Sequence, residues 1–582
     1  SGEFSVNVSV LRLPKNKGSR WLAGVLGALM LLGSGITAQA QFLWPGHSLF
    51  PSSGSVDSAE QRGSHLAARL DAYCRQPPEE VARKAQLRQQ AAQSNAAWAE
   101  YTQVLAEHGA ALIACRSQRW PQIQAIWVRL HPCDANPGVL DQVFDQVVNL
   151  GYNRVFIETF YDGRSILPDG AGGIWPSLQP NADLLDLALK AARRRGLSAY
   201  AWVFSLNFGY SYGQRPDRQV ALARNGRGIT TVLDPATALS EDLGSPGEVF
   251  VDPFHPLARR DFAELVRRIL QRQPDGILFD YIRYPRGSGG SSVAATVRDL
   301  WIHGEAARKA YLDLAENPAG RALLERYLSQ GYVTVRDVQQ LDAAYAEEPR
   351  WRQPGDPWPS PTEKWALSPE LLDWAAQDMA SRNWQGDQLS SAKDLPESLE
   401  KPADSSSEAA APTPAPSPTP STAVRQERWQ QQLWQLSVEF ARYGVLDYLQ
   451  QAAQPAQRLG IPVGAVFFPE GNQAVGEGFD ARLQPWDRFD PGMEWHPMAY
   501  AKCEDSSCVA QQVEQVLAVA SPQTFVCPAI AGLWGQAQRQ RPSLETQTAE
   551  LARRFPQLPC VSHFALSWIE PELERSRRTC QL

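Results

Sequence analysis

Several features that would place a sequence in a familiar class are missing here. The 56 Lys and Arg residues are outnumbered by 63 Asp and Glu, which gives a net charge of −7 and no broad basic excess. This balance argues against a nucleic-acid-binding protein. Neither a CxxC…CxxC nor an HExxH spacing occurs, so no zinc site is indicated. We therefore expect neither a metal nor a cofactor.

The apolar segment near the N-terminus is short. It runs from Trp21 to about Leu32, whereas a transmembrane helix needs ~20 apolar residues. Four basic residues precede it between positions 12 and 20, and Ala38-Gln39-Ala40 follows it. This pattern is typical of a secretory signal peptide with an A-x-A cleavage site, and it predicts a mature start at Gln41.

Residues 1–40 are accordingly interpreted as a signal peptide, and the first four, Ser-Gly-Glu-Phe, as a cloning scar. No cysteine follows the apolar run, so a lipoprotein is not expected. We predict an exported protein, periplasmic or extracellular. The alternative is a membrane-anchored protein that keeps an uncleaved signal.

Eight cysteines fit an oxidising, exported environment. Eight cysteines allow 105 pairings, so the full connectivity is left open. Two pairs are favoured by position. Cys74 and Cys115 would join the two arms of a helical hairpin, and Cys503 and Cys508 would close a tight loop.

The chain divides by composition into several regions. Residues 60–115 are rich in Ala, Gln, Glu and Leu with helical periodicity, and they indicate a helical hairpin. A tract at 402–423 is rich in Pro, Ser, Thr and Ala, and is expected to be a disordered linker. The predicted domains are an N-terminal helical region at 41–120, strands one to four at 121–285, a helical Trp-rich insertion at 286–401, the linker, and strands five to eight with a tail at 424–582.

Short apolar, β-branched and aromatic runs recur from residue 124 onward. Eight such runs are present: Ala125–His131, Arg154–Phe160, Ser198–Leu206, Gly276–Tyr281, Pro462–Phe468, Met493–Tyr500, Thr524–Ile530 and Ser562–Ile569. Amphipathic segments separate them: Val139–Leu150, Asp183–Arg195, Phe262–Gln271 and Gln426–Gln451 among others. Eight alternations of strand and helix predict an α/β protein with a (β/α)8 TIM barrel, interrupted by a long insertion after strand four.

The fourth run ends in a carboxylate. Asp280 closes an apolar strand, so its side chain is expected at the C-terminal end of the barrel, where such enzymes place their catalytic groups. Burial of a carboxylate is costly unless it is paired or functional. Arg283 lies close enough in sequence to keep it ionised. The alternative is an Asp280–Arg283 pair that only holds the loop.

Six segments together resemble the bacterial glycosyl-hydrolase-like family 10, a DUF187-type barrel family. They are PDGILFDYIRYP, AIWVRLH, NLGYNRVFIETFYDGRSILPD, RRRGLSAYAWVF, DPFHPLARRDFAELVRRIL and HPMAYA. The resemblance covers about 124–285 and 425–571. It implies a TIM-barrel glycosidase acting on envelope glycans, peptidoglycan strands among them.

The fourth strand is also similar to the Asp-x-x-Asp-x-Asp-x-Glu strand of chitinase-type barrels. Ile282 stands where the chitinase acid would be Glu, so the substrate-assisted chitinase mechanism is not carried over. Tyr281 stands where many members of the glycosyl-hydrolase-like family have a second Asp. The identity of a second carboxylate is therefore open.

Glycoside cleavage usually needs two carboxyl groups, one acid and one base or nucleophile. We predict Asp280 and Glu158 as this pair, with Glu470 as the third candidate. The alternative for Glu158 is a salt bridge with Arg129, and for Glu470 a solvated loop position. Glu494 ranks lower because it lies early on its strand. The sequence leaves the roles of acid and base open.

Aromatic and polar residues near the strand ends are candidates for holding a sugar. The predicted substrate-binding residues are Arg129, Tyr161, Asp162, Arg164, Trp202, Asn207, Tyr281, Arg283, Tyr284, His496, Tyr500, Trp534, Trp568 and Glu570. Trp568 is favoured as a sugar platform. Most of the 19 tryptophans are expected to pack in the core.

These features predict a secreted glycoside hydrolase that cleaves a bacterial envelope polysaccharide by carboxylate acid–base catalysis. The first alternative is a non-catalytic glycan-binding or scaffold protein on a degenerate barrel. A further hypothesis is that the segment 286–422 recruits an envelope protein. Sugar identity, linkage, stereochemical outcome and oligomeric state are not readable from the sequence.

Overall fold

The computed structural model describes residues 62, 65–168, 174–232, 247–353 and 421–581, all within the unit Phe42–Leu582. The predicted signal peptide, four insertion tryptophans (Trp358, Trp365, Trp374 and Trp384) and nearly all of the 402–423 tract therefore lie outside the described residues.

Eight parallel strands of the described chain form a nearly closed barrel. They are β1 (Ile123–Val128), β2 (Arg154–Tyr161), β4 (Ser198–Phe204), β5 (Ile277–Asp280), β7 (Val463–Phe467), β10 (Glu494–Pro497), β11 (Ala529–Ala531) and β12 (Cys560–Phe564). Their order is β10-β7-β5-β4-β2-β1-β12-β11, and two parallel bridges, Trp495–Val526 and Met498–Ala529, join β10 to the β11 segment. The predicted eight-stranded, TIM-like barrel is thus confirmed.

The strands are buried along nearly their whole length, as expected for parallel strands covered by helices. The eighth strand was predicted too late in the sequence. It spans Cys560–Phe564, and the later residues of the predicted run, Leu566–Ile569, form helix α17.

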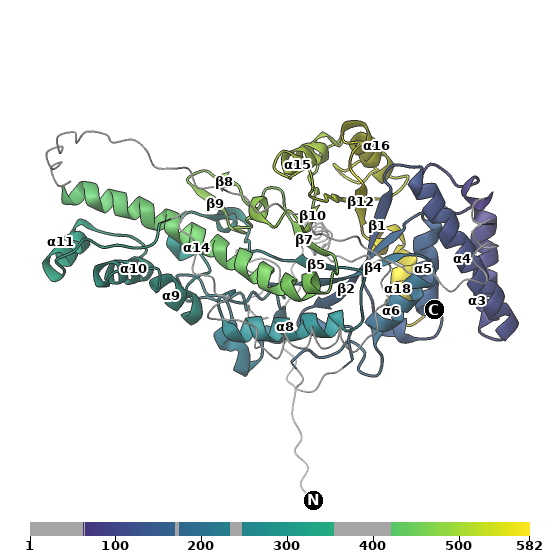
Figure 1. The fold of residues 1–582 in the computed structure, drawn as a ribbon, viewed down its shortest axis with the longest axis horizontal. Helices are drawn as coiled ribbons and strands as arrows, with labels where there is room; N and C mark the ends of the chain where they lie inside the picture. The colour runs from purple at the N-terminus through teal and green to yellow at the C-terminus, as the bar shows by residue number, and fades with distance from the viewer. Residues whose placement is uncertain (1–61, 63–64, 169–173, 233–246, 354–420, 582) are drawn as a thin grey trace, which may run out of the picture. The chain divides into compact units, whose positions relative to one another are not determined.

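Helices surround the barrel (Figure 1). They are α5 (Val139–Asn149), α6 (Leu184–Arg193), α8 (Pro256–Leu270), α14 (Thr422–Arg458), α15 (Ser507–Leu517), α16 (Leu544–Arg554), α17 and α18 (Pro571–Arg578). Sequence features fix their ends. The Asp183 side chain caps α6 by accepting the Asp186 backbone N–H at 3.1 Å, and Pro256 occupies the first turn of α8, where its missing N–H has no cost.

Shorter elements complete the described fold. The two-residue strand β3 (Arg164–Ser165) pairs with β2, while β6 (Val293–Ala294), β8 (Ala474–Val475) and β9 (Gly478–Asp480) form a small antiparallel sheet. One-turn helices are α7 (Tyr210–Gly213), η1 (Pro132–Ala135), η2 (Pro216–Ala221), η4 (Gly289–Ser292), η5 (Val297–Asp299) and η6 (Trp486–Arg488).

The N-terminal region contains the helices α3 (Pro78–Ala91) and α4 (Asn95–Ser117), which pack against each other. Leu87, Tyr101, Val104 and Leu105 form an apolar cluster between them. A disulfide joins Cys74 to Cys115, as the sequence predicts. The helix pair therefore has a small apolar core of its own.

Buried polar contacts attach this helix pair to the barrel. Asp145 of α5 accepts hydrogen bonds from Arg88 of α3 (2.6 Å), Tyr101 of α4 (2.9 Å) and Arg195 beyond α6 (2.9 Å). Lys84 is buried beside them. We call these five side chains the Asp145 cluster. Burial opposes ionisation of Asp145, but the surrounding cations lower its pKa.

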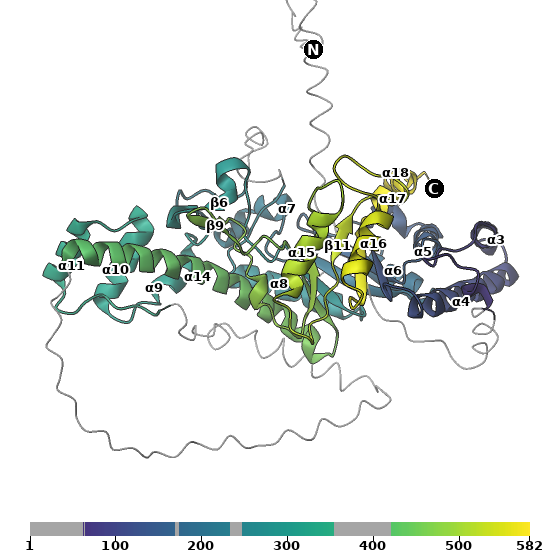
Figure 2. The same cartoon turned by 90° about the horizontal axis from the view of Figure 1, so that it is seen from above.

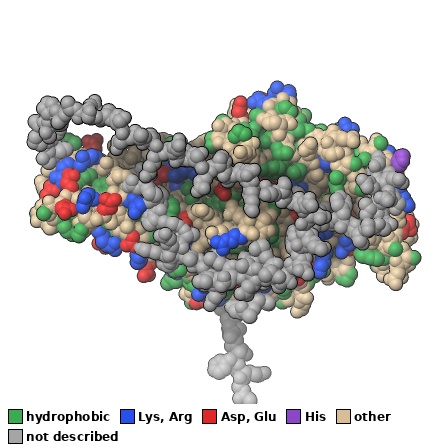
Figure 3. All heavy atoms as spheres, viewed as in Figure 1, with side chains coloured by type: hydrophobic (Ala, Val, Ile, Leu, Met, Phe, Trp, Pro, Cys, Tyr) green, Lys and Arg blue, Asp and Glu red, His purple; other side chains and the backbone are tan. Residues whose placement is uncertain are grey.

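The described part of the insertion contains α9 (Glu305–Leu312), α10 (Pro318–Gln330) and α11 (Val335–Ala344), which lie along the first half of α14 (Figures 1 and 2). Arg425 of α14 pairs with Asp342 at 2.6 Å, and the Gln426 and Gln430 side chains bond the backbone of Val333. Acidic and basic side chains are intermixed over α9–α11 on the face drawn in Figure 3. Local ion pairs, such as Lys309–Asp313 at 2.8 Å, account for part of this pattern.

The second half of α14 packs on the barrel and supplies the helix that follows strand four. The Phe440 ring stacks on Phe254 at 4.3 Å, and Tyr448 donates a hydrogen bond to the Ser205 carbonyl at 3.1 Å. One helix thus belongs to both the insertion and the barrel.

All eight cysteines are paired. Besides Cys74–Cys115, the bonds are Cys133–Cys580, Cys503–Cys508 and Cys527–Cys560. The predicted Cys503–Cys508 loop is confirmed. Four disulfides suggest an oxidising, exported environment.

Candidate active site

The N-terminal end of the barrel is closed by an ionic group. Glu494 accepts a hydrogen bond from the Tyr200 hydroxyl and lies 3.5 Å from Arg154 Nη1 and 3.1 Å from His496 Nε2. Toward the opposite end, the Trp127 and Trp202 rings meet at 6.0 Å. Because side chains fill the N-terminal end of the barrel, reactive groups are expected at the C-terminal ends of the strands.

Asp280 is the last residue of β5 and is only 2% exposed. Its Oδ1 accepts the Tyr281 backbone N–H at 2.6 Å, and its Oδ2 accepts the Trp202 indole N–H at 3.2 Å. Burial raises the pKa of Asp280 to about 7, although these hydrogen bonds and the charge of Arg283 oppose the rise. This carboxyl can therefore hold or release a proton near neutral pH.

Tyr281 connects Asp280 to a second carboxylate. Its φ of 51° lies in the left-handed region, which costs of order 1–3 kcal/mol for a side chain of this kind. In this conformation the backbone N–H reaches Asp280, while the phenol donates to Glu248 Oε1 at 3.2 Å. Burial raises the pKa of Glu248, and Arg283 and this hydrogen bond oppose the rise.

The charge of Arg283 acts on both acids, Asp280 and Glu248. Its guanidinium stacks over the Tyr281 ring at 4.6 Å and the Phe250 ring at 5.4 Å. The alternative expected from sequence, a direct Asp280–Arg283 pair that holds the loop, is replaced by this through-space contact.

Glu248 was not among the residues predicted from sequence. It lies in the long connection between β4 and α8, which carries several other acidic residues. Asn207 places it, because its Oδ1 accepts the Val249 N–H at 3.1 Å, and a bridge joins Asn207 to Phe250. The only sequence signal is an acid beside the apolar run Val249–Val251. Asn207 itself is buried and holds this loop in place. The sequence had instead predicted that Asn207 contacts the sugar.

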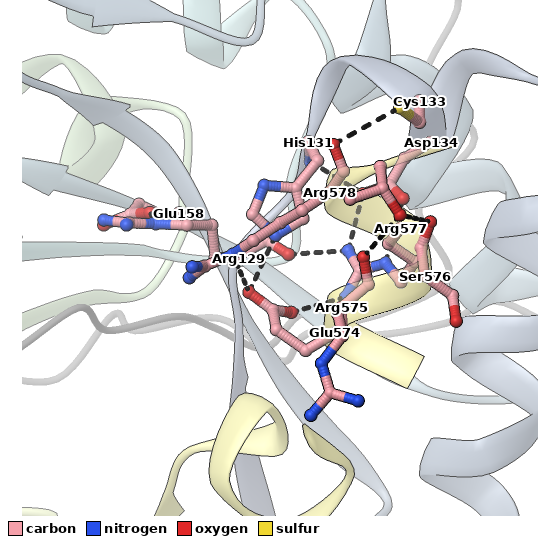
Figure 4. A network of polar contacts seen from close by, with 11 residues as sticks. Arg129, His131, Cys133, Asp134, Glu158, Glu574, Arg575, Ser576, Arg577 and Arg578 are labelled. Carbon is pink, nitrogen blue, oxygen red and sulfur yellow. Dashed lines mark hydrogen bonds and ion pairs between the residues drawn. The ribbon is translucent and has the colours of Figure 1, made fainter. Parts of the chain in front are cut away.

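Glu158 forms the salt bridge that was its alternative interpretation (Figure 4). Its side chain is fully buried, and both carboxylate oxygens accept hydrogen bonds from Arg129, one of them at 2.8 Å. Burial lowers the pKa of Arg129, but the charge and hydrogen bonds of Glu158 have the larger effect, so the pKa of Arg129 is raised. Tyr161 covers the guanidinium at 4.1 Å. Both oxygens of Glu158 are thus occupied by a protein partner.

Residues of helix α18 bond the segment that carries Arg129 (Figure 4). Arg577 donates to Asp134 at 2.5 and 2.9 Å and to the Arg129 carbonyl at 2.7 Å, and Glu574 lies 2.8 Å from His131 Nε2. Burial raises the pKa of Glu574, but His131 and the nearby arginines lower it to about 2. The network orders the segment after β1 and therefore the position of Arg129.

Two further predicted residues pack on Phe564. Tyr500 is half-buried, its ring lies 6.0 Å from that of Phe564, and burial raises its pKa with Asp280 adding to the rise. Trp568 packs on the same Phe564 at 5.1 Å and is partly exposed. The structure thus relates Trp202, Tyr281, Arg283 and Tyr500 to Asp280, while Trp568 is linked to this group through Phe564.

Three predicted sugar-binding residues lie elsewhere. The Tyr284 hydroxyl donates to the Ala441 carbonyl of α14 at 3.3 Å, on the outside of the barrel. His496 belongs to the ionic group at the N-terminal end. Trp534 faces the N-terminal region, where its ring meets Tyr73 at 4.8 Å and its N–H bonds the Tyr152 hydroxyl. Sequence position on or after a strand could not show in which direction these side chains point.

Asp162 and Glu570 have local structural partners. Asp162 accepts bonds from the Ser211 backbone and hydroxyl (3.3 and 3.1 Å), and Arg164 is exposed. Glu570 accepts a bond from Gln146 of α5 at 2.8 Å, and so points away from the barrel mouth.

Glu470, the third catalytic candidate, is 40% exposed. It lies 3.4 Å from Arg482 and accepts a bond from Gln512 at 3.1 Å. This is close to its alternative interpretation as a loop carboxylate.

In the part of the chain that the structure describes, no three His, Cys, Asp or Glu side chains are grouped to hold a metal ion. No helix among the described residues is long and apolar enough to cross a bilayer. Comparison of the chain with protein-family models and with curated proteins gave no match.

Proposed function

We propose that this protein is an exported glycoside hydrolase that cleaves a bacterial envelope glycan. The observation that carries the proposal is Asp280, a buried acid at the C-terminal end of a barrel strand whose pKa is raised to about 7. A carboxyl that is protonated near neutral pH is what a general acid for glycosidic oxygen requires. The Trp202 indole donates to Asp280, Tyr500 interacts with Asp280 electrostatically, and the partly exposed Trp568 packs with Tyr500 on Phe564.

Asp280 is assigned as the general acid and Glu248 as the second carboxyl group. Glu158 suits the second role less well, because Arg129 occupies both of its oxygens. Glu248 has one oxygen held by Tyr281, and no described residue bonds the other. Burial raises the pKa of Glu248, and the charge of Arg283 opposes this rise and so favours the ionised form that a base or nucleophile requires.

The resemblance to the DUF187-type glycosidase family supports the choice of glycan, and the four disulfides support export. A signal peptide at residues 1–40 that is cleaved after Ala40 remains part of this proposal. So does recruitment of an envelope protein by the 286–422 segment.

The function is tested by incubating the purified protein with denuded peptidoglycan strands, chitin oligomers and α-glucans. Mass analysis of the products should show new reducing ends on at least one β-linked amino-sugar substrate. Binding of a glycan without any product would instead support the non-catalytic scaffold, for which the salt-bridged Glu158 is the favourable observation.

The rate should fall above neutral pH. A general acid must be protonated, so kcat/KM is expected to decline as pH rises through about 7, the pKa of Asp280. Glu248→Gln removes a negative charge that helps to raise this pKa, so the alkaline limb of the pH–rate profile should move to lower pH. The same variant should also lower kcat, because the second carboxyl is lost.

Glu470→Gln is the matched change at the exposed candidate, and its pH profile should coincide with that of the unmodified protein. An unchanged profile for Glu248→Gln would remove Glu248 from the site.

A further inference from the structure

Arg541 is a partly buried cation whose guanidinium makes one hydrogen bond to the described residues. It lies in the loop between β11 and α16, where reciprocal backbone bonds with Gln538, both 2.9 Å, fix its position. Its Nη2 donates to the Tyr500 carbonyl at 3.0 Å. An arginine carries five N–H donors, and no other described residue bonds this guanidinium.

The other partly buried arginines around the strand ends carry acids or rings. Arg129 holds Glu158, and Arg482 pairs with Asp480 at 2.7 Å. Arg283 is covered by aromatic rings and its charge acts on two acids. Arg541 has no carboxylate within ion-pair distance in the described chain, and burial lowers its pKa. A partly buried cation without an acidic partner is unfavourable unless an anionic ligand pairs with it.

The position of Arg541 relates it to the candidate acid. Tyr500 connects the two: its carbonyl accepts the Arg541 N–H at 3.0 Å, its ring packs on Phe564 at 6.0 Å, and its phenol interacts electrostatically with Asp280. The Arg541 guanidinium is therefore one aromatic residue away from the proposed proton donor. A glycan cleaved at Asp280 would present a neighbouring sugar to Arg541.

We propose that Arg541 binds a carboxylate on the sugar next to the scissile bond, so that the enzyme selects acidic glycans. The inference rests on the proposed function for the location of the glycan. A guanidinium offers two parallel donors to a carboxylate. A single cation also matches one negative charge, which favours a carboxylated sugar over a doubly charged phosphate group.

Binding is measured by calorimetry with three probes on the full chain carrying Asp280→Asn, which prevents turnover. The probes are denuded peptidoglycan strands, the same strands with their lactyl carboxylates converted to methyl amides, and chitin oligomers. Arg541→Gln in this background should weaken binding of the acidic strand by about 10–100-fold and leave the two neutral probes within about threefold. Arg541→Lys keeps the charge and should recover part of the loss, and that binding should weaken as salt is added.

Three outcomes would overturn the inference: equal binding of acidic and capped strands, equal loss for all three probes in Arg541→Gln, or no binding of any probe. An equal loss of affinity for all three probes would mean that Arg541 only holds Tyr500 in position. Hydrolysis of the same three probes is measured separately with the unmodified protein. Hydrolysis of neutral chitin without a preference for acidic strands would leave the glycosidase intact and refute the role of Arg541. Acid-selective binding by the Asp280→Asn variant, with no hydrolysis of any probe by the unmodified protein, would refute the glycosidase and keep Arg541 as a carboxylate site.

Discussion

Asp280→Asn is expected to lower the rate of glycan hydrolysis by about 10²–10⁴-fold, the usual contribution of a general acid. Asn has the shape of Asp and can still accept the Tyr281 N–H, so the backbone at the end of β5 should be preserved. It cannot transfer a proton to the glycosidic oxygen. Initial rates of product release, followed by mass analysis, measure the effect.

Asp275→Asn is the matched control. Asp275 precedes the same strand at its other end, and burial raises its pKa to about 7 as well, against the opposing Ala199 N–H and nearby arginines. Loss of a raised-pKa Asp from this end of the barrel should leave the rate within about twofold. Full activity of Asp280→Asn, or equal losses in both variants, would contradict the assignment.

Stability gives a second measure of the Asp280 variant. The folded-state pKa of Asp280 lies above its ordinary value of 3.8. The folded protein therefore binds more protons between pH 3.8 and 7, and the free energy of unfolding falls as pH rises through this window. Asp280→Asn removes that dependence and should be at least as stable as the unmodified protein above pH 7. Lost activity with retained stability distinguishes chemistry from misfolding.

Asp145→Asn should destabilise the fold by about 3–5 kcal/mol, the typical result of removing one partner from a buried ion pair. Among the described residues, the change leaves Arg195, which is 1% exposed, with Asp141 as its one acidic partner at 3.0 Å. It also weakens the attachment of α3 and α4 to the barrel. Urea unfolding with the disulfides intact measures the loss. A change below about 1 kcal/mol would show that the Asp145 cluster is not a stabilising contact.

Lys84→Met changes the same cluster in the opposite direction. The Lys84 ammonium is buried without a hydrogen-bond partner in the described chain, and burial lowers its pKa to about 7, although Asp145 opposes the drop. Between pH 7 and 10.5 the unfolded chain binds the extra proton, so the free energy of unfolding of the unmodified protein rises with pH by up to about 1.4 kcal/mol per unit. Lys84→Met should lack this rise and be the more stable protein at pH 6. An identical pH dependence in both proteins would show that Lys84 does not titrate in this window.

The barrel was predictable because its strands and helices have clear local patterns. Apolar runs such as Val155–Ile157 suit strands buried on both faces, and their alternation with amphipathic helices sets the closed parallel order. The bounds of the eighth strand were harder to predict. Ser562–Ile569 is apolar enough to suit either a strand or the short helix α17, which forms over its second half.

The candidate site was predictable only in part. Asp280 could be identified because a carboxylate that ends an apolar strand is costly to bury unless it is paired or functional. Glu248 could not be, because it reaches the barrel through Asn207 and Tyr281, and these contacts depend on how a long loop returns. Trp534 and Tyr284 show the opposite error. Both follow strands, yet side-chain direction turns them outward, and sequence spacing carries no information on that direction.

The Cys133–Cys580 bond joins residues 447 positions apart, one just beyond β1 and the other just beyond α18. In topological terms, the polypeptide between them is a covalent ring with a tail on each side. A single peptide-bond cleavage anywhere within the ring would leave both fragments linked, so a nicked molecule should migrate as one species until a reductant is added. A break in one of the loops within this ring therefore would not separate the barrel into two halves.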